Sequence, residues 1–372
     1  MRVNWITSEN LPKGLYRSFA ELFTSSLSQS IISNVDTKLI MMKVGDHLIF
    51  PVSINDQEQE NSFVCSPYTA YVRYAQSELR SKVPSKVLQV PLSLVIKLFD
   101  RLLQWGNIDR IVQANNFLLS TNPYQEWSGE EIAHITAFIS KNFPHHAVVF
   151  RSLNEYQHQH LIGQFESNKY SKIANRQVYI FDMDHQKWIR HQNNKHDNRI
   201  IKKMHLQYVG HEAMKDYLDQ ALHLYNLLYL VKYSKYNPQF TLKYFENCHQ
   251  DQLMYFQGYI DGNKKLKAFA GLFIIDNTIT SPLVGYDTGA PLQQGLYIHA
   301  IRLVMRYKFE SGKLLNLSSG APYFKRLRGG LPSLEYMVVY NKHLPWRRRM
   351  PWTILQIISN KIGIPIMKKY EL

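Results

Sequence analysis

The stretch that decides the fold runs from Lys264 to Tyr340. It reads KKLKAFAGLFII at residues 264–275, ITSPLVGYDTGAPLQQGLYIHAIRLVMRYKFESG at 279–312, KLLNLSSGAPYFKRLRGG at 313–330 and LEYMVVY at 334–340. Two apolar runs of strand length follow Asp261 and Gly262, which form a hairpin turn signal. We therefore expect this stretch to open with two strands.

An amphipathic helix follows the second apolar run. Apolar side chains recur at helical spacing from Leu296 to Tyr307, with basic side chains on the other side, and Gly312 follows as a C-cap. A third strand, a polar Ser-Ser-Gly turn, a short helix and a fourth strand at Glu335 to Tyr340 complete the stretch. This order predicts a mixed sheet with a right-handed crossover helix.

The order of elements resembles the acyl-transferring half of the GNAT superfamily. It is most similar to the larger two-domain members, the Fem-type aminoacyltransferases and the BioF2-like acetyltransferase domains. The resemblance is carried by GYDTG at 285–289, the helix that starts at Gly295, and SSGAPYFKRLRGG at 318–330 ahead of a strand with Glu335 and Tyr336. It covers the last third of the chain strongly and the middle weakly. It implies an α/β (α+β) fold of two GNAT-like domains, with mixed central sheets flanked by helices and a degenerate N-terminal domain.

The length of 372 residues also favours two domains. We place a degenerate GNAT-like domain at residues 1–150 and an acyltransferase domain with a basic C-terminal segment at residues 151–372. The first opens with a helix and a hairpin of two strands around Gly45 and Asp46. We expect it to serve as scaffold and substrate wall.

Several classes of protein fit the sequence poorly. No apolar run is long enough to span a bilayer, and the N-terminus lacks the apolar core of a signal peptide. The two cysteines, Cys65 and Cys248, form no CxxC pair or zinc motif, and the histidines show no metal-binding spacing. We expect a cytoplasmic protein with no metal site, no transmembrane segment and no tightly bound cofactor.

The charge is strongly basic, at +15, and is concentrated near the C-terminus. From residue 301 onward there are fourteen lysines and arginines against three glutamates, a net charge of +11. Such a field attracts nucleic acid, an acidic carrier protein, a phosphorylated cofactor or an anionic membrane, although a solvated basic surface is the bland alternative. The polar residues 183–207 read as a flexible arm or an RNA- or phosphate-contacting loop. The final segment, apolar and then basic, would dock on the protein or rest on a membrane.

Four residues are candidates for catalysis. Tyr286 and Asp287 follow the second strand, where Asp287 would accept the acceptor's proton or orient its ammonium group, or would simply cap an Asx turn. His299 titrates near neutral pH, but a histidine beside an apolar stripe is more often a core residue. Lys325 has the greatest weight, because the resemblance to Fem-type proteins also places a lysine there.

Further residues are candidates for binding. Those for the donor are Ser318, Ser319, Arg326, Arg328, Arg347, Arg348 and Arg349, of which the last three lie in a predicted loop. Those for the acceptor are Arg151, Arg176, Lys232, Tyr233 and Asn237. Arg151 and Arg176 flank predicted strands and would bind an acidic group, or would form structural ion pairs with Glu155 or Asp182.

One motif is absent. GNAT members that use acetyl-CoA carry (Q/R)-x-x-G-x-(G/A) before the main helix, and its N–H groups bind the pyrophosphate. Here the segment Gly289 to Tyr297 lacks that spacing, and Pro291 removes an N–H donor. We therefore expect an acyltransferase whose activated donor is aminoacyl-tRNA, or next a carrier protein, ahead of free acyl-CoA, with an amine or hydroxyl of a small molecule or peptide as acceptor. The alternatives are a conventional acyl-CoA-dependent N-acetyltransferase and a non-catalytic RNA- or membrane-surface-binding protein on a GNAT scaffold.

Overall fold

One mixed sheet runs through the computed structural model, which describes residues 1–24, 27–56, 58, 60–74, 76, 96–97 and 99–370. The strand order is β1-β2-β3-β4-β5-β12-β6-β11-β10-β9-β8-β7. The strands are β1 (Val3–Ile6), β2 (Lys38–Val44), β3 (Leu48–Asn55), β4 (Ile111–Ala114), β5 (Ala147–Asn154), β6 (Ser171–Phe181), β7 (Gln207–Val209), β8 (Tyr255–Ile260), β9 (Leu266–Ile275), β10 (Thr278–Tyr286), β11 (Leu314–Asn316) and β12 (Leu331–Tyr340).

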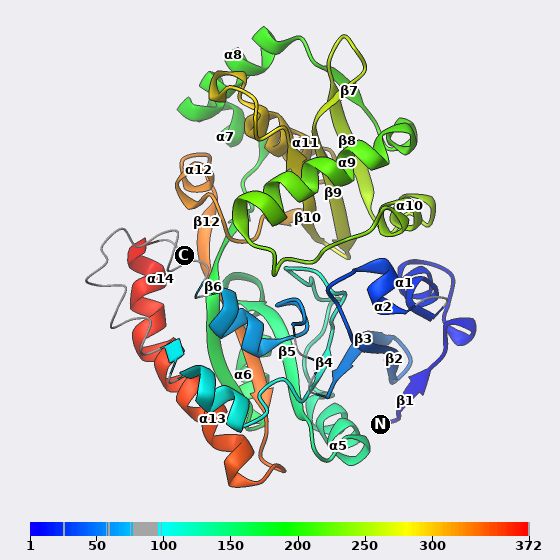
Figure 1. Ribbon diagram of the computed structural model, residues 1–372, viewed down its shortest axis with the longest axis vertical. Coiled ribbons are helices and arrows are strands. Elements are labelled where there is room, and N and C mark those ends of the chain that lie inside the picture. The colour runs from blue at the N-terminus through cyan, green and yellow to red at the C-terminus, as the bar shows by residue number, and fades with distance from the viewer. Residues whose placement is uncertain are drawn as a thin grey trace.

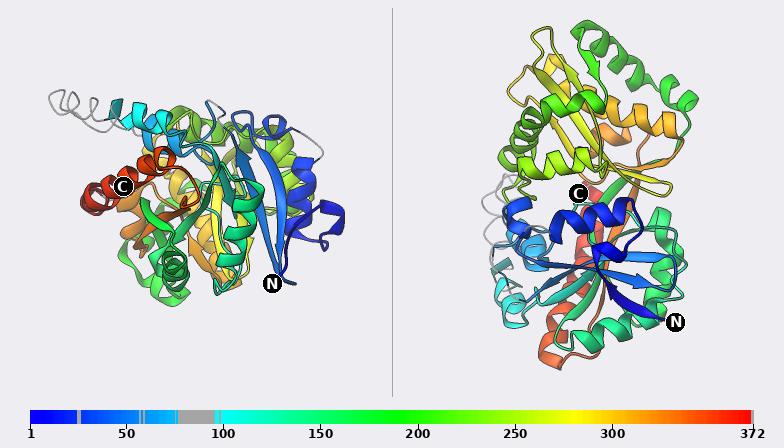
Figure 2. Two further views of the ribbon diagram at one scale, coloured as in Figure 1. Left: turned by 90° about the horizontal axis from the view of Figure 1, so that it is seen from below. Right: turned by 90° about the vertical axis from the view of Figure 1, so that its right-hand side faces the viewer.

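Helices flank this sheet on both faces (Figures 1 and 2). They are α1 (Leu15–Thr24), α2 (Ser28–Ile31), α5 (Ile132–Asn142), α6 (Glu155–Ser167), α7 (His185–Arg190), α8 (Gln192–Met204), α9 (Leu218–Tyr225), α10 (Leu242–Gln250), α11 (Leu296–Ser311), α12 (Pro322–Arg326), α13 (Trp346–Ile358) and α14 (Ile364–Tyr370). Single π-helical turns lie at Thr69–Arg73, Asn226–Tyr233 and Ser359–Gly363, and short 3-10 helices at Ser8–Asn10, Glu212–Tyr217 and Leu292–Gln294. The predicted α/β class is confirmed.

The stretch from β9 to β12 has the predicted order of elements. β9 and β10 are antiparallel, α11 crosses over, and β11 returns parallel to β10. Asp261 closes the hairpin before β9 through its backbone N–H to the carbonyl of Lys265 at 3.0 Å. Gly312 ends α11 with φ 70°, a left-handed conformation that favours glycine. Local sequence signals therefore fix this half of the fold.

The same order of elements occurs twice. One strand, a helical segment, three antiparallel strands, a crossover helix, a parallel strand, a helix and a last strand run from β1 to β6 and again from β7 to β12. Each half lends its last strand to the other, because β12 lies between β5 and β6 while β6 lies between β12 and β11. Figures 1 and 2 show these two strands joining the lower half to the upper half.

This exchange bears on the domain boundary. Residue 150, where we predict the division, lies within β5, and the topological repeat changes in the segment 182–206 between β6 and β7. Buried side chains also cross between the halves. The rings of Phe117 and Phe273 lie 4.9 Å apart in a core that contains residues of both repeats. The two halves therefore share one sheet and one core, and the 150/151 division stays a prediction.

Two expectations for basic segments are wrong. Residues 183–207 are not a flexible arm, since most of them form α7 and α8, and Asp184 caps α7 by accepting from the N–H of Lys187 at 2.8 Å. The arginine triplet lies on α13 and not in a loop. Pro351 is accommodated in this helix because it packs against Gly106, where an added Cβ would lie 2.3 Å from its Cγ. The contact of Pro351 with Gly106 joins residues far apart in the chain, so no local sequence pattern reveals what stabilises α13.

Within the described part of the chain, no helix combines the length and apolar character required to cross a bilayer.

Candidate functional site

A buried lysine lies at the centre of the candidate site. Lys325 belongs to the short helix α12, which begins with Pro322. Its side chain is 3% exposed, and its Nζ donates to the carbonyl oxygens of Leu317 and Ser319, both at 2.7 Å, and of Ser318 at 3.2 Å. These carbonyls form the turn that follows β11. The lysine therefore fixes this turn and places a buried ammonium group beneath it.

Burial changes the acidity of this lysine. Desolvation by burial, followed by the nearby positive charge of Arg176, lowers the pKa of Lys325 from 10.5 to about 7. The group then carries a partial proton occupancy at neutral pH. A lysine with this pKa is typical of functional sites, although structural networks also produce such shifts.

Arg176 joins the strands that the two halves exchange. It lies on β6, and its Nε donates to Oε1 of Glu335 on β12 at 2.7 Å. Its second nitrogen donates to the carbonyl of Ser120 at 2.6 Å and to Oγ1 of Thr121 at 2.8 Å. The ion-pair partner is thus neither Glu155 nor Asp182, which we considered from the sequence. Arg176 remains 16% exposed in its side chain, so one edge faces outward.

Arg151 lies deeper than Arg176. It is 6% exposed on β5 and donates to the carbonyl of Leu119 at 2.8 Å, while its Nε has no partner among the described residues. Burial, followed by repulsion from Arg176, lowers the pKa of Arg151 to about 10. Oε2 of Glu335 is also buried without a partner. We call Arg151, Arg176, Lys325 and Glu335 the cationic cluster, since Glu335 is paired with Arg176, and Arg151 and Lys325 each lie near the charge of Arg176.

The cationic cluster lies between the two repeats. Thr121, in the loop after β4, accepts from Arg176 and donates to Oγ of Ser318 at 3.0 Å, so it links the first repeat to the turn after β11. Buried positive charge in excess of negative charge stabilises an anion that enters or forms beside it. This arrangement suits an oxyanion or a bound acidic group.

The strands next to the cluster separate. β10 pairs with β11 only from Thr278 to Thr280, and a register shift between Thr280 and Leu283 follows, while β10 itself continues to Tyr286. Past Thr280, the described part of β10 has no ladder partner on the β11 side. Tyr286 therefore stands at an opening between two parallel strands, which the resemblance to GNAT proteins implies for the acyl donor.

Aromatic side chains line this opening. The ring of Tyr297, on the first turn of α11, lies 5.7 Å from that of Tyr286 and 4.7 Å from that of Phe324 on α12. Lys232 donates to the hydroxyl of Tyr286 at 2.9 Å, and Tyr233 is 46% exposed beside it in sequence. Three predicted site residues, Tyr286, Lys232 and Tyr233, thus come from two separate elements to one region.

Asp287 is held in a turn. Its Oδ2 accepts from Nζ of Lys267 at 3.0 Å, and its Oδ1 accepts from the N–H of Gly289 at 3.2 Å. Burial raises the pKa of Asp287, but the hydrogen bond and charge of Lys267 with the Gly289 N–H outweigh it, so the pKa is lowered overall. A carboxylate held in this way is a poor base. The geometry matches the Asx-turn alternative.

His299 lies within the core. It is fully buried on α11, its Nδ1 is 3.0 Å from the carbonyl oxygen of Gly295, and its ring meets Tyr259 edge-on at 5.5 Å. Burial lowers its pKa, and the Gly295 carbonyl only partly opposes this effect. Within the described part of the chain, His299 forms no hydrogen bond or ring contact with a residue of the cationic cluster. Its position matches the core-histidine alternative.

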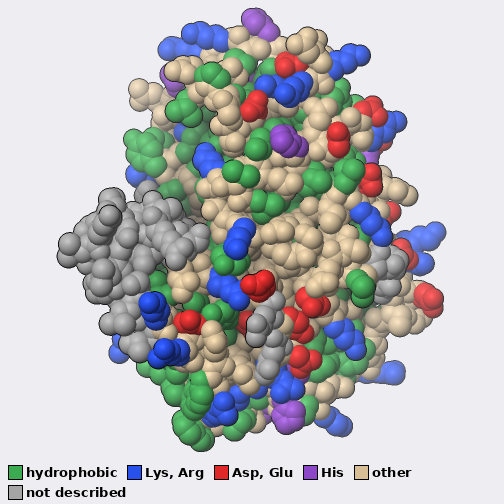
Figure 3. Space-filling view, viewed as in Figure 1, with side chains coloured by type: hydrophobic (Ala, Val, Ile, Leu, Met, Phe, Trp, Pro, Cys, Tyr) green, Lys and Arg blue, Asp and Glu red, His purple; other side chains and the backbone are tan. Residues whose placement is uncertain are grey.

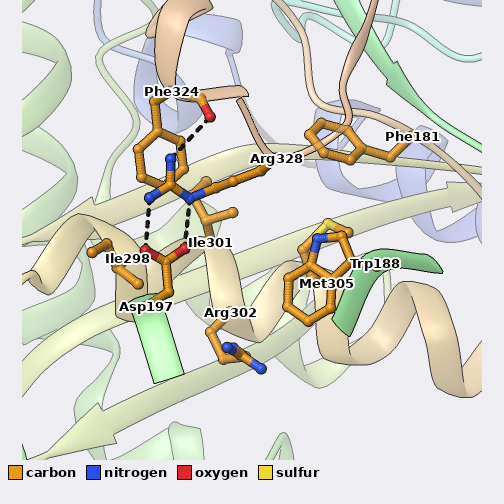
Figure 4. A pocket seen from close by; sticks show the side chains of 9 residues that line it. All are labelled: Phe181, Trp188, Asp197, Ile298, Ile301, Arg302, Met305, Phe324 and Arg328. Carbon is orange, nitrogen blue, oxygen red and sulfur yellow. Dashed lines mark hydrogen bonds and ion pairs between the residues drawn. The ribbon is translucent and has the colours of Figure 1, made fainter. Parts of the chain in front are cut away.

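Helix α8 approaches α11 through Asp197, which lies beside Ile298 and Ile301 (Figure 4). Asp197 is 4% exposed in its side chain and accepts two hydrogen bonds, at 2.5 and 2.6 Å, from Arg328, which also lies over the ring of Phe324. A Cβ added to Gly295 would lie 2.6 Å from Cγ2 of Ile200, so α8 touches the residue that caps α11. Arg328 thus serves as a structural bridge, and Ile200 of α8 packs against Gly295 at the start of α11.

The remaining predicted residues are dispersed. Ser318 and Ser319 lie in the turn above Lys325, and the guanidinium of Arg326 lies 5.7 Å from the ring of Tyr323 on the exposed side of α12. Asn237 is buried and donates to the carbonyls of Tyr229 and Ser234, so it fixes the end of a helix.

The arginine triplet lies on α13, away from the turn above Lys325 (Figure 1). Arg348 is buried and donates to three carbonyls, those of Asn107, Arg110 and His145. Arg347 and Arg349 are exposed, and Arg347 lies over the ring of Trp105. The structure therefore does not bring the triplet to the cationic cluster.

Sequence reasoning missed three residues. Thr121 and Asp197 gave no signal, because each contacts a residue more than a hundred positions away. Glu335 was part of the resemblance but had no assigned role, although one of only three acids from residue 301 onward is a usable hint. Across the described residues, no group of three histidine, cysteine or acidic side chains is arranged to hold a metal ion.

Comparisons with known proteins bear on the fold. The chain is similar to the crystal structure of FemX, with a TM-score of 0.56 at 9% identity, over 94% of this chain and 100% of that one. A tandem GNAT protein from the clavulanic acid biosynthesis pathway matches with a TM-score of 0.42 at 8% identity over 91% and 98%, and L-PGS from Bacillus licheniformis with 0.43 at 13% over 60% and 76%. No family model and no curated protein matches the sequence. The FemX-like fold confirms the predicted resemblance at the level of fold.

Proposed function

We propose that the chain is an acyltransferase that moves an aminoacyl or acyl group from a large anionic carrier, aminoacyl-tRNA before an acyl carrier protein, to an amine or hydroxyl. The observation that carries the proposal is Lys325, buried beneath the turn after β11, with its pKa lowered to about 7 and Arg176 beside it. The FemX-like fold supports a transferase at a coarse level. No resident cofactor is required, because the donor is already activated.

The chemistry needs one new bond and one broken bond. The acceptor nitrogen or oxygen attacks the donor carbonyl carbon, the bond to the carrier oxygen or sulfur breaks, and the proton lost by the acceptor ends on the leaving group. The negative charge that develops on the carbonyl oxygen is what the cationic cluster stabilises. Asp287 is paired with Lys267 and Glu335 with Arg176, so neither is offered as the base.

The choice of donor rests on α8. Acetyl-CoA-dependent GNAT members bind the pyrophosphate at the start of the main helix, and here Ile200 packs on Gly295 at that point. α7 and α8 also expose Lys187, Arg190, Lys195, Arg199, Lys202 and Lys203. A basic helical surface next to the opening favours an anionic macromolecule over free acyl-CoA.

The test compares donors. We would measure fluorescence-anisotropy binding of aminoacylated tRNA, deacylated tRNA and acetyl-CoA to the full chain over a salt series. We expect tight, steeply salt-dependent binding that prefers the aminoacylated form. Salt-insensitive binding of acetyl-CoA alone would favour the conventional N-acetyltransferase, and binding of RNA without consumption of any donor would favour the non-catalytic alternative.

A pair of lysine variants tests the site. Lys325→Met is expected to lower the rate of aminoacyl transfer to a panel of simple amines at least 100-fold, since one charged stabilising group is worth about that much. Lys308→Met is the matched control, because Lys308 is equally buried in the second repeat and donates to the carbonyl of Met183 at 2.7 Å, outside the cluster. Equal activity of both variants would remove Lys325 from the site.

A further inference from the structure

The C-terminal helices present a face that the proposed function does not use. After β12 the chain forms α13, the π-helical turn Ser359–Gly363 and α14, which run along the flank of the first repeat (Figure 1). Residues 346–370 contain six lysines and arginines and no aspartate or glutamate. The segment therefore has a net charge of +6 without any internal compensation.

One side of this segment is firmly docked. Trp352 and Leu355 are 1% exposed in a core with residues of β5, β6 and β12. Asn360 donates to the carbonyl of Lys172 and accepts from the N–H of Ala174, each at 2.8 Å, so it binds the edge of β6 as a further strand residue would. With Arg348 bonded to three carbonyls, the segment is a fixed part of the fold.

The other side exposes large apolar side chains. Their exposed fractions are 65% for Trp346, 48% for Ile357, 58% for Ile362, 41% for Ile366 and 60% for Tyr370. Among the described residues these are five of the fifteen large hydrophobic side chains that are exposed, gathered on 25 residues, and Trp105 packs beside Trp346 with ring centroids 5.8 Å apart. Exposed apolar groups at this density mark an interaction surface.

Basic side chains are interleaved with these apolar ones. The exposed cations are Arg347, Arg349, Lys361, Lys368 and Lys369. None forms an ion pair with an acid in the described structure. Figure 3 shows hydrophobic and basic side chains side by side over α13 at the lower left of the molecule. We call this outward side the C-terminal face.

We propose that the C-terminal face binds the surface of a membrane that contains anionic phospholipids. A docked helical segment with tryptophan, tyrosine and isoleucine beside lysine and arginine has the composition of an interfacial anchor, in which apolar groups enter the headgroup boundary while cations meet lipid phosphates. The inference does not depend on the proposed function.

Other occupants fit this face less well. A second copy of the chain would bring two surfaces with five exposed cations each together in a symmetric interface, which charge repulsion opposes. RNA would find rings for base stacking at Trp346 and Tyr370, but it would also have to cover three exposed isoleucines, which offer none. The exposed surface of α7 and α8 differs from the C-terminal face, because it presents six cations but no large hydrophobic side chain.

The test uses the full chain and vesicles. One set of vesicles contains equal amounts of phosphatidylglycerol and phosphatidylcholine, and the other contains phosphatidylcholine alone. The fraction of the chain that sediments with each set is measured over a salt series. We expect binding to the anionic vesicles and at least 10-fold weaker partitioning to the neutral ones. Failure of the wild-type chain to bind anionic vesicles at low salt would overturn the proposal.

Three variants separate the contributions. Ile357→Ser/Ile362→Ser/Ile366→Ser and Arg349→Glu/Lys361→Glu/Lys368→Glu are each expected to reduce partitioning at least 10-fold. Lys195→Glu/Arg199→Glu/Lys202→Glu on α8 is the matched control and is expected to change it less than twofold. All nine side chains are exposed or partly exposed, so the fold is expected to persist, and circular dichroism checks this.

Three outcomes would contradict the proposal. Equal losses from the two charge-reversal variants would mean that overall charge attracts the vesicles. Full binding by the triple-serine variant would remove the apolar contribution. The third outcome is evidence of another occupant. Self-association that sedimentation velocity detects and the triple-serine variant abolishes would assign the C-terminal face to a second copy. Competition by deacylated tRNA for this face alone would assign it to RNA.

Discussion

The loops that follow β4 and β10 occupy equivalent places in the two repeats and differ in burial. After β4, residues 115–119 and 121–124 are all buried. After β10, none of residues 287–295 is buried, and Leu292 is 94% exposed. In the first repeat the loop after β4 therefore fills the space beyond the end of its strand. In the second repeat the corresponding space beyond β10 stays accessible.

Polar contacts explain the difference. In the first repeat Asn116 is fully buried, donates to Oγ of Ser53 and the carbonyl of Val64, and accepts from the N–H of Leu118. In the second repeat the corresponding loop has a turn at Asp287, is not buried, and contacts Ile200 of α8 only at Gly295. The comparison teaches that one topology supports both a closed scaffold and an accessible site, and that the loop sequence decides which one forms.

The largest effect is expected where α8 is bonded to the turn that follows α12. Asp197→Ala leaves Arg328 partly buried without its carboxylate, and breaking such a pair costs about 3–5 kcal/mol. Urea unfolding followed by circular dichroism measures this loss. Glu310→Ala is the matched control, since the Arg306–Glu310 pair is exposed and is worth about 0.5 kcal/mol. Equal losses of unfolding free energy from the two variants would show that the Asp197–Arg328 pair does not hold α8 beside the loop that follows β10.

A smaller loss is expected in the closed loop. Asn116→Ala removes four side-chain hydrogen bonds and leaves buried groups without partners, at a cost of about 2–3 kcal/mol in the free energy of unfolding. Donor binding per folded molecule is expected to stay unchanged, because this loop is scaffold. Asn263→Ala, at an exposed turn, is the control for stability. A loss of donor binding without a loss of stability would make Asn116 and its loop, and not only Arg151 and Arg176, part of the donor site.

Lys325, in the second repeat, is expected to make the free energy of unfolding depend on pH. The folded chain holds the pKa of Lys325 near 7 against 10.5 for an ordinary lysine. Between these values the unfolded chain binds more protons, so stability rises with pH from about 7 to 10.5, with a slope of at most about 1.4 kcal/mol per unit. The difference in unfolding free energy between wild type and Lys325→Met, measured at pH 7 and pH 9.5, isolates this contribution. A difference that does not change with pH would mean that Lys325 keeps an ordinary pKa.

The smallest effect is expected at the exposed loop tip. Leu292→Ser is expected to change the free energy of unfolding by less than about 0.5 kcal/mol, because the side chain is already in water. Phe117→Ser, in the equivalent loop of the first repeat, is the opposite case, since its buried ring packs against Phe273. Thermal unfolding of the two variants in parallel compares the loops directly. Similar destabilisation by both would contradict the difference in burial.

The sequence by itself determined the elements from β9 to β12 and the resemblance to Fem-type proteins. Hydrophobic periodicity, the turn at Asp261 and the cap at Gly312 are local properties, and each acts within a few residues of chain. The same signals gave the first hairpin, and the resemblance to Fem-type proteins gave the weight on Lys325. They also gave the core alternative for His299 and the turn alternative for Asp287, which the geometry matches.

Only the tertiary structure decided how these elements combine. Three features join residues that lie far apart in the chain. They are the exchange of β6 and β12, the ion pair of Arg176 with Glu335, and the contact of α8 with Gly295. No periodicity encodes such contacts, because they depend on which surfaces meet when the two repeats share one sheet. The lowered pKa of Lys325 follows for the same reason, since burial and a neighbouring charge exist only in the folded chain.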